Sequence, residues 1–91
     1  MKTLRSPANA FKRDFKRITK RGYDPEKFEA VLDLLRRGQP LTEAHRDHPL
    51  KGEWKGWREC HIEPDWLLIY QTTETEILLA RTGTHADLFG T

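Results

Sequence analysis

The sequence predicts a single α+β domain, in which two N-terminal helices pack on one face of a small, twisted, mostly antiparallel sheet. Apolar residues recur with a helical period over residues 10–38. From residue 54 onward the period changes to two, as in β-strands. Helices followed by strands are typical of an α+β arrangement. We expect residues 1–91 to form this one domain, because 91 residues suit a single small domain.

The first helix is expected to begin at Ser6-Pro7, because serine is a favoured N-cap residue and proline suits the first helical position. Residues 1–5 precede it and could pair as an edge strand. The apolar residues of the helix share one stripe at helical spacing, namely Phe11, Phe15 and Ile18. Gly22 is the residue expected to end the helix.

A second helix is expected after Asp24-Pro25-Glu26, which combines a capping carboxylate, a proline with suitable φ and an acidic first turn. Its apolar stripe consists of Phe28, Val31, Leu32 and Leu35. Gly38 ends it. Because only a few residues join the two helices, we expect an antiparallel helical hairpin.

Residues 39–53 show no sustained period and contain two prolines, so they are expected to be a long loop with one helical turn near residues 42–45. Three strands should follow, ending near Glu63, Thr72 and Thr82. The connections between them are short, which predicts an antiparallel meander. Gly83 ends the last strand, and residues 85–90 are expected to be a short tail.

Charge is distributed unevenly along the chain, although the net charge is only +2. The first 21 residues carry a net charge of +7, and the remainder carries −5. Such an asymmetry favours a polyanion or an acidic partner, with an ordinary solvated helix face as the alternative. The candidate contacts to a polyanion such as RNA are the basic residues of the first helix that lie mostly off its apolar stripe, Lys12, Arg13, Lys16 and Arg17.

The composition indicates a cytoplasmic protein. The longest apolar run, residues 66–70, is far too short to span a bilayer, and the first 21 residues lack the apolar stretch of a secretory signal. Cys60 is the one cysteine, which excludes an intrachain disulfide and suits a reducing compartment.

Three histidines, an aspartate and an arginine lie where the expected strands begin or end. His61 is near the end of one strand and Asp65 at the start of the next. His85 follows the third strand, and Arg81 precedes it by four residues. His48 comes from the loop ahead of the sheet. Because a meander brings such strand ends together, we expect these side chains to converge at one end of the sheet.

This set of side chains suits cleavage of RNA without a metal ion or other cofactor. RNA supplies its own nucleophile, the 2′-OH, so cleavage needs a base, an acid and a cation for the phosphorane. Histidine serves both proton roles, because its ordinary pKa of about 6.5 lies near working pH. Phe89, near the end of the chain, either seals the edge of the core or stacks on a base at the site.

Other interpretations of these residues remain. A single strand histidine is more often structural, and we expect His45 to be so. The four histidines could also ligate zinc, but Pro49 disfavours a helical His45–His48 pair and no cysteine pair is present. The three tryptophans are more often core and rim residues than platforms for bases, with Trp57 open to either role.

The C-terminal half also resembles the YafQ branch of the RelE/ParE toxin superfamily. The residues that carry the resemblance are His48-Pro49-Leu50, Gly52, Trp54-Lys55-Gly56, Arg58, His61 to Trp66, Ile69-Tyr70, Arg81 to His85, and Leu88-Phe89-Gly90. The helical half agrees in pattern only. The resemblance implies a type II toxin with two helices against a twisted, mostly antiparallel sheet, as in RelE.

The resemblance further implies that the chain cuts mRNA in the ribosomal A site, leaves a 2′,3′-cyclic phosphate, and pairs with an antitoxin, often in a two-plus-two complex. The active-site set of the family falls on His48, His61, Asp65, His85 and Phe89. Arg81 resembles a phosphate-binding arginine of the family. Beyond the resemblance, we assign His85 as the general acid and either His61 or Asp65 as the base.

Two functions of other classes stay open. Related toxins of the ParE type act on DNA gyrase and lack this histidine set. A non-catalytic binding module, such as a repressor subunit, is the other. Both would leave His61 and His85 dispensable.

Overall fold

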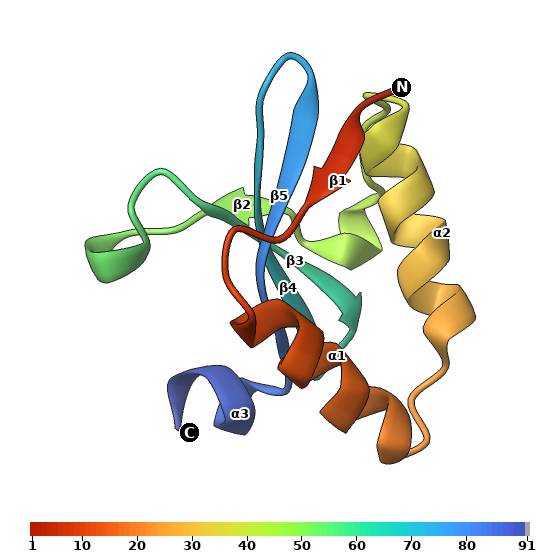
Figure 1. Ribbon diagram of the computed structural model, residues 1–91, viewed down its shortest axis with the longest axis vertical. Coiled ribbons are helices and arrows are strands. Elements are labelled where there is room, and N and C mark those ends of the chain that lie inside the picture. The colour runs from red at the N-terminus through yellow and green to blue at the C-terminus, as the bar shows by residue number, and fades with distance from the viewer. Residues whose placement is uncertain (91) are drawn as a thin grey trace.

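The computed structural model describes residues 1–90, which form a five-stranded mixed sheet with two long helices packed against it (Figure 1). The strands are β1 (Thr3–Arg5), β2 (His48–Pro49), β3 (Arg58–Glu63), β4 (Trp66–Thr72) and β5 (Glu76–Gly83). The helices are α1 (Ala10–Lys20), α2 (Pro25–Arg36) and α3 (His85–Phe89), with 3-10 turns η1 (Glu43–His45) and η2 (Gly52–Trp54). Within residues 1–90, no helix has the length and apolar character needed to cross a membrane.

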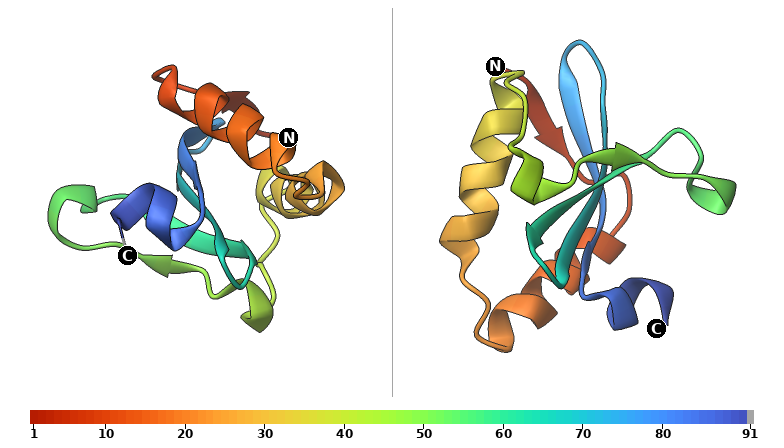
Figure 2. Two further views of the ribbon diagram at one scale, coloured as in Figure 1. Left: turned by 90° about the horizontal axis from the view of Figure 1, so that it is seen from below. Right: turned by 180° about the vertical axis from the view of Figure 1, so that it is seen from behind.

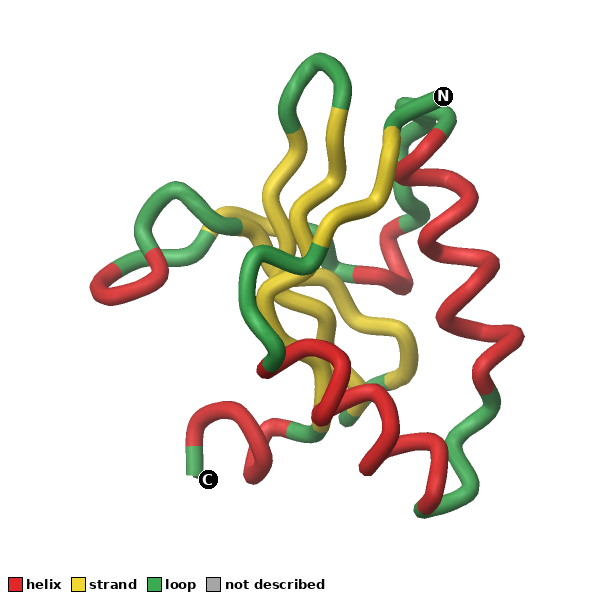
Figure 3. The backbone as a smooth tube through the Cα atoms, in the orientation of Figure 1, coloured by secondary structure: helices red, strands yellow, loops and turns green. Residues whose placement is uncertain are grey.

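The strands, which are yellow in Figure 3, lie in the order β1-β5-β4-β3-β2. The predicted meander is confirmed, because β3, β4 and β5 pair antiparallel in sequence order. The predicted edge strand is β1, which pairs parallel with β5 and makes the sheet mixed. The helical turn predicted within the loop over residues 39–53 is confirmed as η1, but the prediction of loop for the rest of this segment was wrong at residues 48 and 49. His48 and Pro49 pair antiparallel with Glu59 and Arg58 and form the opposite edge strand, β2.

The start of α2 follows its local sequence. Asp24 accepts a hydrogen bond of 2.9 Å from the backbone N–H of Glu26, and Pro25 occupies the first turn, as predicted. The start of α1 does not, and the prediction of Ser6-Pro7 as its N-terminus was wrong. The helix begins at Ala10, and the side chain of Asn9 makes no capping bond. Because β1 pairs with β5 up to Arg5, residues 6–9 must first carry the chain out of the sheet.

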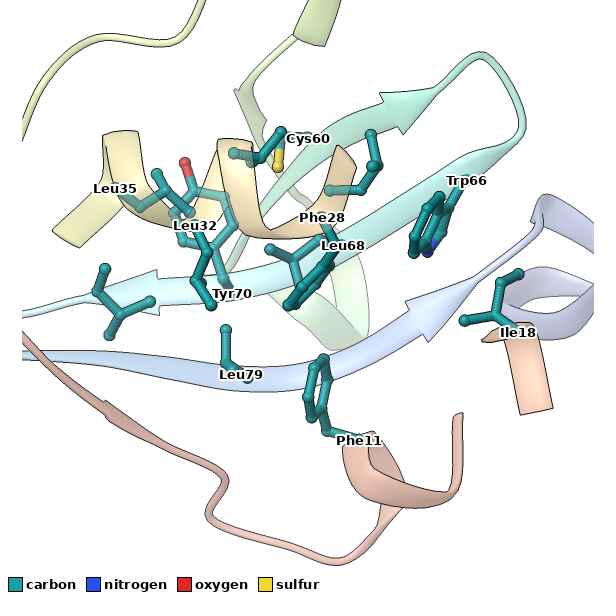
Figure 4. Close-up of a cluster of buried hydrophobic side chains, with 13 residues drawn as sticks. Phe11, Ile18, Phe28, Leu32, Leu35, Cys60, Trp66, Leu68, Tyr70 and Leu79 are labelled. Carbon is teal, nitrogen blue, oxygen red and sulfur yellow. The ribbon is translucent and has the colours of Figure 1, made fainter. Parts of the chain in front are cut away.

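The two long helices run in opposing directions but splay apart from the turn that joins them, so they form a V rather than a closely packed hairpin (Figures 1 and 2). The ring of Phe28 on α2 lies 4.9 Å from that of Phe15 and 5.7 Å from that of Phe11, both on α1. Phe28 also stacks on Trp66 of β4, with centroids 6.2 Å apart. This aromatic contact joins both helices to the sheet over one core (Figure 4).

The core lies on one face of the sheet. It contains the predicted helix stripes and the inward residues of the strands, among them Phe11, Ile18, Phe28, Leu32, Leu35, Cys60, Trp66, Leu68, Tyr70 and Leu79 (Figure 4). Successive side chains of a strand point to opposite faces, so the neighbours of these inward strand residues face away from the helices. The opposite face therefore presents a second set of side chains, which includes Glu59 and His61 of β3.

Residues 85–89 form the helix α3, so the prediction of a short tail was wrong. Thr84 and Asp87 cap it reciprocally, with the Asp87 N–H donating to Thr84 Oγ1 at 3.1 Å and the Thr84 N–H donating to Asp87 Oδ2 at 3.0 Å. The Arg21 guanidinium donates to both Asp87 oxygens at 2.7 and 3.1 Å. The hydrogen bond from Arg21 lowers the pKa of Asp87 to about 2. These contacts anchor α3 beside the end of β5.

Gly83 makes the junction between β5 and α3 possible. Its φ is +154°, and a Cβ built on it would lie 2.9 Å from the Cβ of Asp87. A side chain at this position would therefore collide with the residue that caps α3. As Figure 2 shows, α3 consequently lies across the strands from α2, on the side of the second sheet face.

Candidate active site

The register of the sheet fixes which side chains share the second face. Glu59 pairs with Ile69, and Ile69 pairs with Arg81, so these three residues form one row across β3, β4 and β5. His61 and Leu67 form the next row toward the sheet end, which Gly83 completes. The glutamate, the histidine and the arginine are thus brought onto one face by strand pairing alone.

A β-bulge turns Arg81 toward this face. Tyr70 pairs with Leu79, but the preceding Ile69 pairs with Arg81, which leaves Ala80 as an extra residue in β5. Leu79 points into the core. Without the extra residue Arg81 would follow Leu79 to the core side, because side chains two apart share a face. The bulge thus reverses the alternation and places the guanidinium on the second face.

His85 and Asp65 form the most direct contact of the site. The His85 Nδ1 atom lies 2.5 Å from Asp65 Oδ1, and the backbone N–H of His85 donates to the same oxygen at 2.8 Å. These two interactions, the backbone one first, lower the pKa of Asp65. The carboxylate therefore stays ionised, orients the imidazole and leaves its Nε2 atom directed elsewhere.

His61 lies beside this pair. Its ring centroid is 5.7 Å from that of His85, with the planes inclined by 63°. Its Nδ1 atom is 3.3 Å from the carbonyl oxygen of Pro64, and its Nε2 atom is 3.6 Å from Glu59 Oε1. His61 of β3 and His85 of α3 therefore stand close enough to act on one substrate group.

Glu59 is a member of the site that the sequence did not single out. Its side chain is only 8% exposed, and the same Oε1 atom lies 3.6 Å from Nε2 of both His48 and His61. His48 is held from its other side, because Nδ1 lies 2.6 Å from the Arg46 carbonyl oxygen. The alternation of β3 already placed Glu59 on the face of His61, and this shared face was the signal available in the sequence.

Arg81 is on the site face but is tied to a residue of α1. Its Nε atom donates to Asp14 Oδ2 at 2.5 Å, and Nη2 donates to Asp14 Oδ1 at 3.1 Å. The hydrogen bond to Asp14 raises the pKa of Arg81 above its ordinary value. Asp14 was not predicted from the sequence. It is an acidic residue on the apolar stripe of an otherwise strongly basic helix.

The remaining candidates are exposed residues of α3 and α1. Phe89, on α3, is 41% exposed, so it does not seal the core. The basic candidates Lys12, Arg13, Lys16 and Arg17 lie on α1, with their side chains at least partly exposed. Three of these four line an open hollow of about 470 Å³, together with Lys20 and Arg21.

The histidines do not gather into a metal centre. Among residues 1–90, no group of three or more His, Cys, Asp or Glu side chains is placed to hold an ion. His45 makes a local contact, in which its Nδ1 atom is 3.0 Å from Thr42 Oγ1 and 3.3 Å from the Thr42 nitrogen at the start of η1. This capping contact is the structural role expected for it.

Histidines and carboxylates thus follow one another along one sheet face, from His48 through Glu59 and His61 to His85 and Asp65. The fold is that of the small α+β toxins of the RelE type, a class in which two helices cover one side of a mostly antiparallel sheet. The chain belongs to the YafQ family of that class. The family model for the bacterial toxin of the type II toxin–antitoxin system, YafQ, matches residues 4–90.

Known proteins agree with this assignment over nearly the whole chain. The mRNA interferase toxin YafQ of Escherichia coli K12 is 46% identical over 81 residues, 88% of each chain. YafQ in the E. coli DinJ–YafQ complex superposes with a TM-score of 0.87 at 41% identity, covering 99% of this chain and 100% of that one. A metal-bound toxin from Helicobacter pylori superposes with a TM-score of 0.89 at 41% identity, covering 98% of this chain and 100% of that one.

Proposed function

We propose that the chain is an mRNA endoribonuclease that acts on translating ribosomes and forms the toxin half of a type II toxin–antitoxin pair. The observation that carries this proposal is the convergence of His61, Asp65 and His85 at one end of the sheet. The name mRNA interferase, which belongs to the E. coli relative, supports the same reaction for this chain. A ribosomal substrate would place the chain in the cytoplasm.

The reaction uses the nucleophile that RNA itself carries. A base removes the 2′-OH proton, and the 2′-oxygen attacks the adjacent phosphorus. The bond from phosphorus to the 5′-oxygen then breaks, and an acid delivers a proton to that oxygen. The products are a 2′,3′-cyclic phosphate and a free 5′-OH, and no water or oxidant is consumed in this step.

His85 is suited to the acid role. Asp65 engages its Nδ1 atom at 2.5 Å, so the proton to be transferred is carried on Nε2. The carboxylate also compensates the positive charge of the protonated ring. Because the lowered pKa of Asp65 keeps this group ionised, it remains an acceptor toward His85 through the reaction.

The same contact favours His61 over Asp65 as the base. A carboxylate with a lowered pKa is a poorer proton acceptor, and Asp65 already accepts from both the backbone and the ring of His85. We therefore assign His61 as the base and Asp65 as the residue that orients His85. Glu59, 3.6 Å from His61 Nε2, would stabilise the imidazolium that forms when His61 takes the proton. His48 approaches the same carboxylate and completes the row.

The phosphate and the base of the substrate would be held from β5 and α3. The Arg81 guanidinium supplies the cation next to the phosphorane. Phe89 presents an exposed ring on which a base can stack. Every step is assigned to a side chain, so the proposed mechanism requires neither a metal ion nor a cofactor.

The ribosome would contribute binding surface that the chain lacks. The catalytic face belongs to a chain of only 91 residues, and the positive charge is concentrated on α1. Lys12, Arg13, Lys16 and Arg17 would contact phosphates of ribosomal RNA. A cognate antitoxin, as DinJ is for the E. coli relative, would bind the toxin, and we propose a two-plus-two complex.

Primer extension tests the function. The purified chain is added to ribosomes translating a defined mRNA and to the same mRNA without ribosomes, each with and without excess EDTA. We expect cuts within codons on ribosomes, ends carrying 2′,3′-cyclic phosphate, little cleavage of free mRNA, and no effect of EDTA. Equal cleavage of free mRNA would remove the ribosome from the proposal, and activity lost in EDTA but restored by zinc or magnesium would remove the metal-free mechanism.

A second assay separates the functions of other classes. Growth arrest without any mRNA cleavage, accompanied by inhibition of DNA gyrase, would point to action of the ParE type. Arrest that persists after substitution of both His61 and His85 would exclude the histidine mechanism and favour a binding module.

A further inference from the structure

Asp14 is a buried charged residue for which the mechanism above has no role. Its side chain on α1 is 3% exposed. It nevertheless accepts hydrogen bonds from Arg81 Nε and Nη2, at 2.5 and 3.1 Å, from Arg17 Nη2 at 2.5 Å, and from the backbone N–H of Thr82 at 3.2 Å. A carboxylate this buried is tolerated only when such donors surround it.

The contact with Thr82 fixes the carboxylate relative to β5. β1 pairs with β5 only as far as Leu78, so the later part of this edge has no strand beside it. α1 packs along that part of β5, and Asp14 accepts the free N–H of Thr82. The acceptor of the Arg81 bonds is therefore anchored to the residue that follows Arg81 in the same strand.

The Arg81 side chain is thereby held by one edge. The Nε–H and one N–H of Nη2 donate to Asp14. Within residues 1–90, Nη1 has no hydrogen-bond partner. Nη1 and the second hydrogen of Nη2 therefore form a free edge of the guanidinium. The side chain is 30% exposed. Two parallel N–H groups at such an edge match two oxygens of a phosphate.

We propose that Asp14 is a positioning residue that locks the Arg81 guanidinium so that its free edge faces the phosphate being cleaved. This role rests on the proposed nuclease function. An unanchored arginine would have to be ordered during the reaction, whereas the Asp14 contact orders it beforehand. The Ala80 bulge gives the side chain its face, and Asp14 gives it its orientation.

Whether Asp14→Asn slows cleavage or not distinguishes a positioning role from a simple effect of charge. Asp14→Asn removes a negative charge beside Arg13, Arg17 and Arg81, which line a hollow of about 400 Å³ with it. If only the total charge mattered, this substitution would strengthen RNA binding and would not slow cleavage. If Asp14 positions Arg81, cleavage should slow although the surface has become more positive.

The test is a double-mutant cycle of Asp14→Asn and Arg81→Gln, measured as single-turnover cleavage on saturating programmed ribosomes. We expect Asp14→Asn to lower the rate on the order of 10- to 100-fold, with ribosome affinity equal to native or tighter. In the Arg81→Gln background, Asp14→Asn should have almost no further effect, because it acts through Arg81. The matched control is Asp33→Asn, which breaks the exposed Asp33–Arg37 pair on α2 and should leave the rate at the native value.

Additive effects in the cycle, or a folded Asp14→Asn protein that cuts at the native rate, would overturn the positioning role alone. A native protein that cuts no mRNA would overturn the proposed function, and the positioning role with it. If Asp14→Asn does not fold, the Nε–H signal of Arg81 in the native protein decides by NMR. A resolved signal protected from exchange supports the role, and a signal averaged with those of solvent-exposed arginines overturns it.

Discussion

Asp65 and His85 are 20 positions apart in the chain, and their side chains meet at 2.5 Å. Asp65 lies in the turn before β4, and His85 is the first residue after the cap of α3. The contact forms because antiparallel pairing of β4 with β5 brings the start of one strand to the end of the other. It also joins the sheet to α3, so the arrangement of the site depends on the helix that follows the last strand.

His85→Gln tests the general acid. Glutamine keeps the backbone N–H that donates to Asp65 and retains a polar side chain, but it cannot transfer a proton near neutral pH. We expect the single-turnover cleavage rate on ribosomes to fall on the order of 10²–10⁴-fold. Ribosome affinity and melting temperature should stay near native, because His85 is partly exposed. A variant that cuts at the native rate would remove His85 from the mechanism.

Phe89→Ala tests stacking against packing. The Phe89 ring is 41% exposed, so its removal should change the melting temperature little. If the ring stacks on a base, its removal should weaken binding of the substrate RNA at the site by on the order of 1–3 kcal/mol. Phe89→Trp, which retains a stacking surface, is the matched control and should keep most activity. A protein that melts early but cuts normally while folded would return Phe89 to a packing role.

Glu59→Gln tests the buried carboxylate between two histidines. The substitution keeps the shape but removes the charge that lies 3.6 Å from Nε2 of His48 and of His61. We expect cleavage to slow on the order of tenfold or more, because the imidazolium formed at His61 loses its counter-charge. Glu63→Gln at the end of the same strand, whose partner is Lys27 at 3.5 Å, should cut at the native rate. Equal rates for both variants would show that Glu59 only fills space.

Neutralising Lys12, Arg13, Lys16 and Arg17 together tests α1 as a ribosome contact. We expect weaker ribosome binding with a flatter dependence on salt, since fewer cations are released from the RNA on binding. The fold should persist, because none of the four side chains is buried and Asp14 keeps its Arg81 and Thr82 donors. A control that neutralises Lys27 and Arg37 on and after α2 should bind normally. Unchanged binding of the first variant would leave α1 as a solvated face.

The lowered pKa of Asp87 predicts that part of the folding stability is lost in acid. Its pKa in the folded protein is about 2, below the ordinary 3.8, chiefly because Arg21 donates to it. A lowered pKa contributes stability that is fully present above the ordinary value and is lost as the pH falls toward 2. The Asp87→Asn protein should therefore have a lower melting temperature than the native protein at about pH 5–7. This difference in melting temperature should narrow between about pH 4 and pH 2.

Arg21→Gln should reproduce part of this destabilisation and the same narrowing, because it removes the main cause of the lowered pKa. Thermal melts of the three proteins across this pH range are the measurement. A difference in melting temperature between native and variant proteins that widens in acid would contradict the assignment of Asp87 as the carboxylate that anchors α3.

Local signals in the sequence determined the features that depend on neighbouring residues. Asp24 and Pro25 define the start of α2 through one side-chain bond and one favourable φ. The alternation of Cys60 and Ile62 with His61 defines the two faces of β3. The short turns of the meander then imply that strand ends bearing His61, Asp65 and His85 lie together. α3 also had a local signal, the Thr84 and Asp87 pair, which was not recognised.

The tertiary structure decided the features that depend on distant partners. Ser6-Pro7 carries a helix-start signal, but pairing of β1 with β5 requires those residues for the connection. The Ala80 bulge, which strand pairing alone reveals, turns Arg81 away from the core. Three of the four hydrogen bonds that compensate the burial of Asp14 come from residues 67 and 68 positions away, and a sequence pattern contains no information on such partners. Periodicity and short turns thus determined that the histidines and Asp65 come together, whereas strand register brought Arg81 to the site face and a long-range contact with Asp14 holds it there.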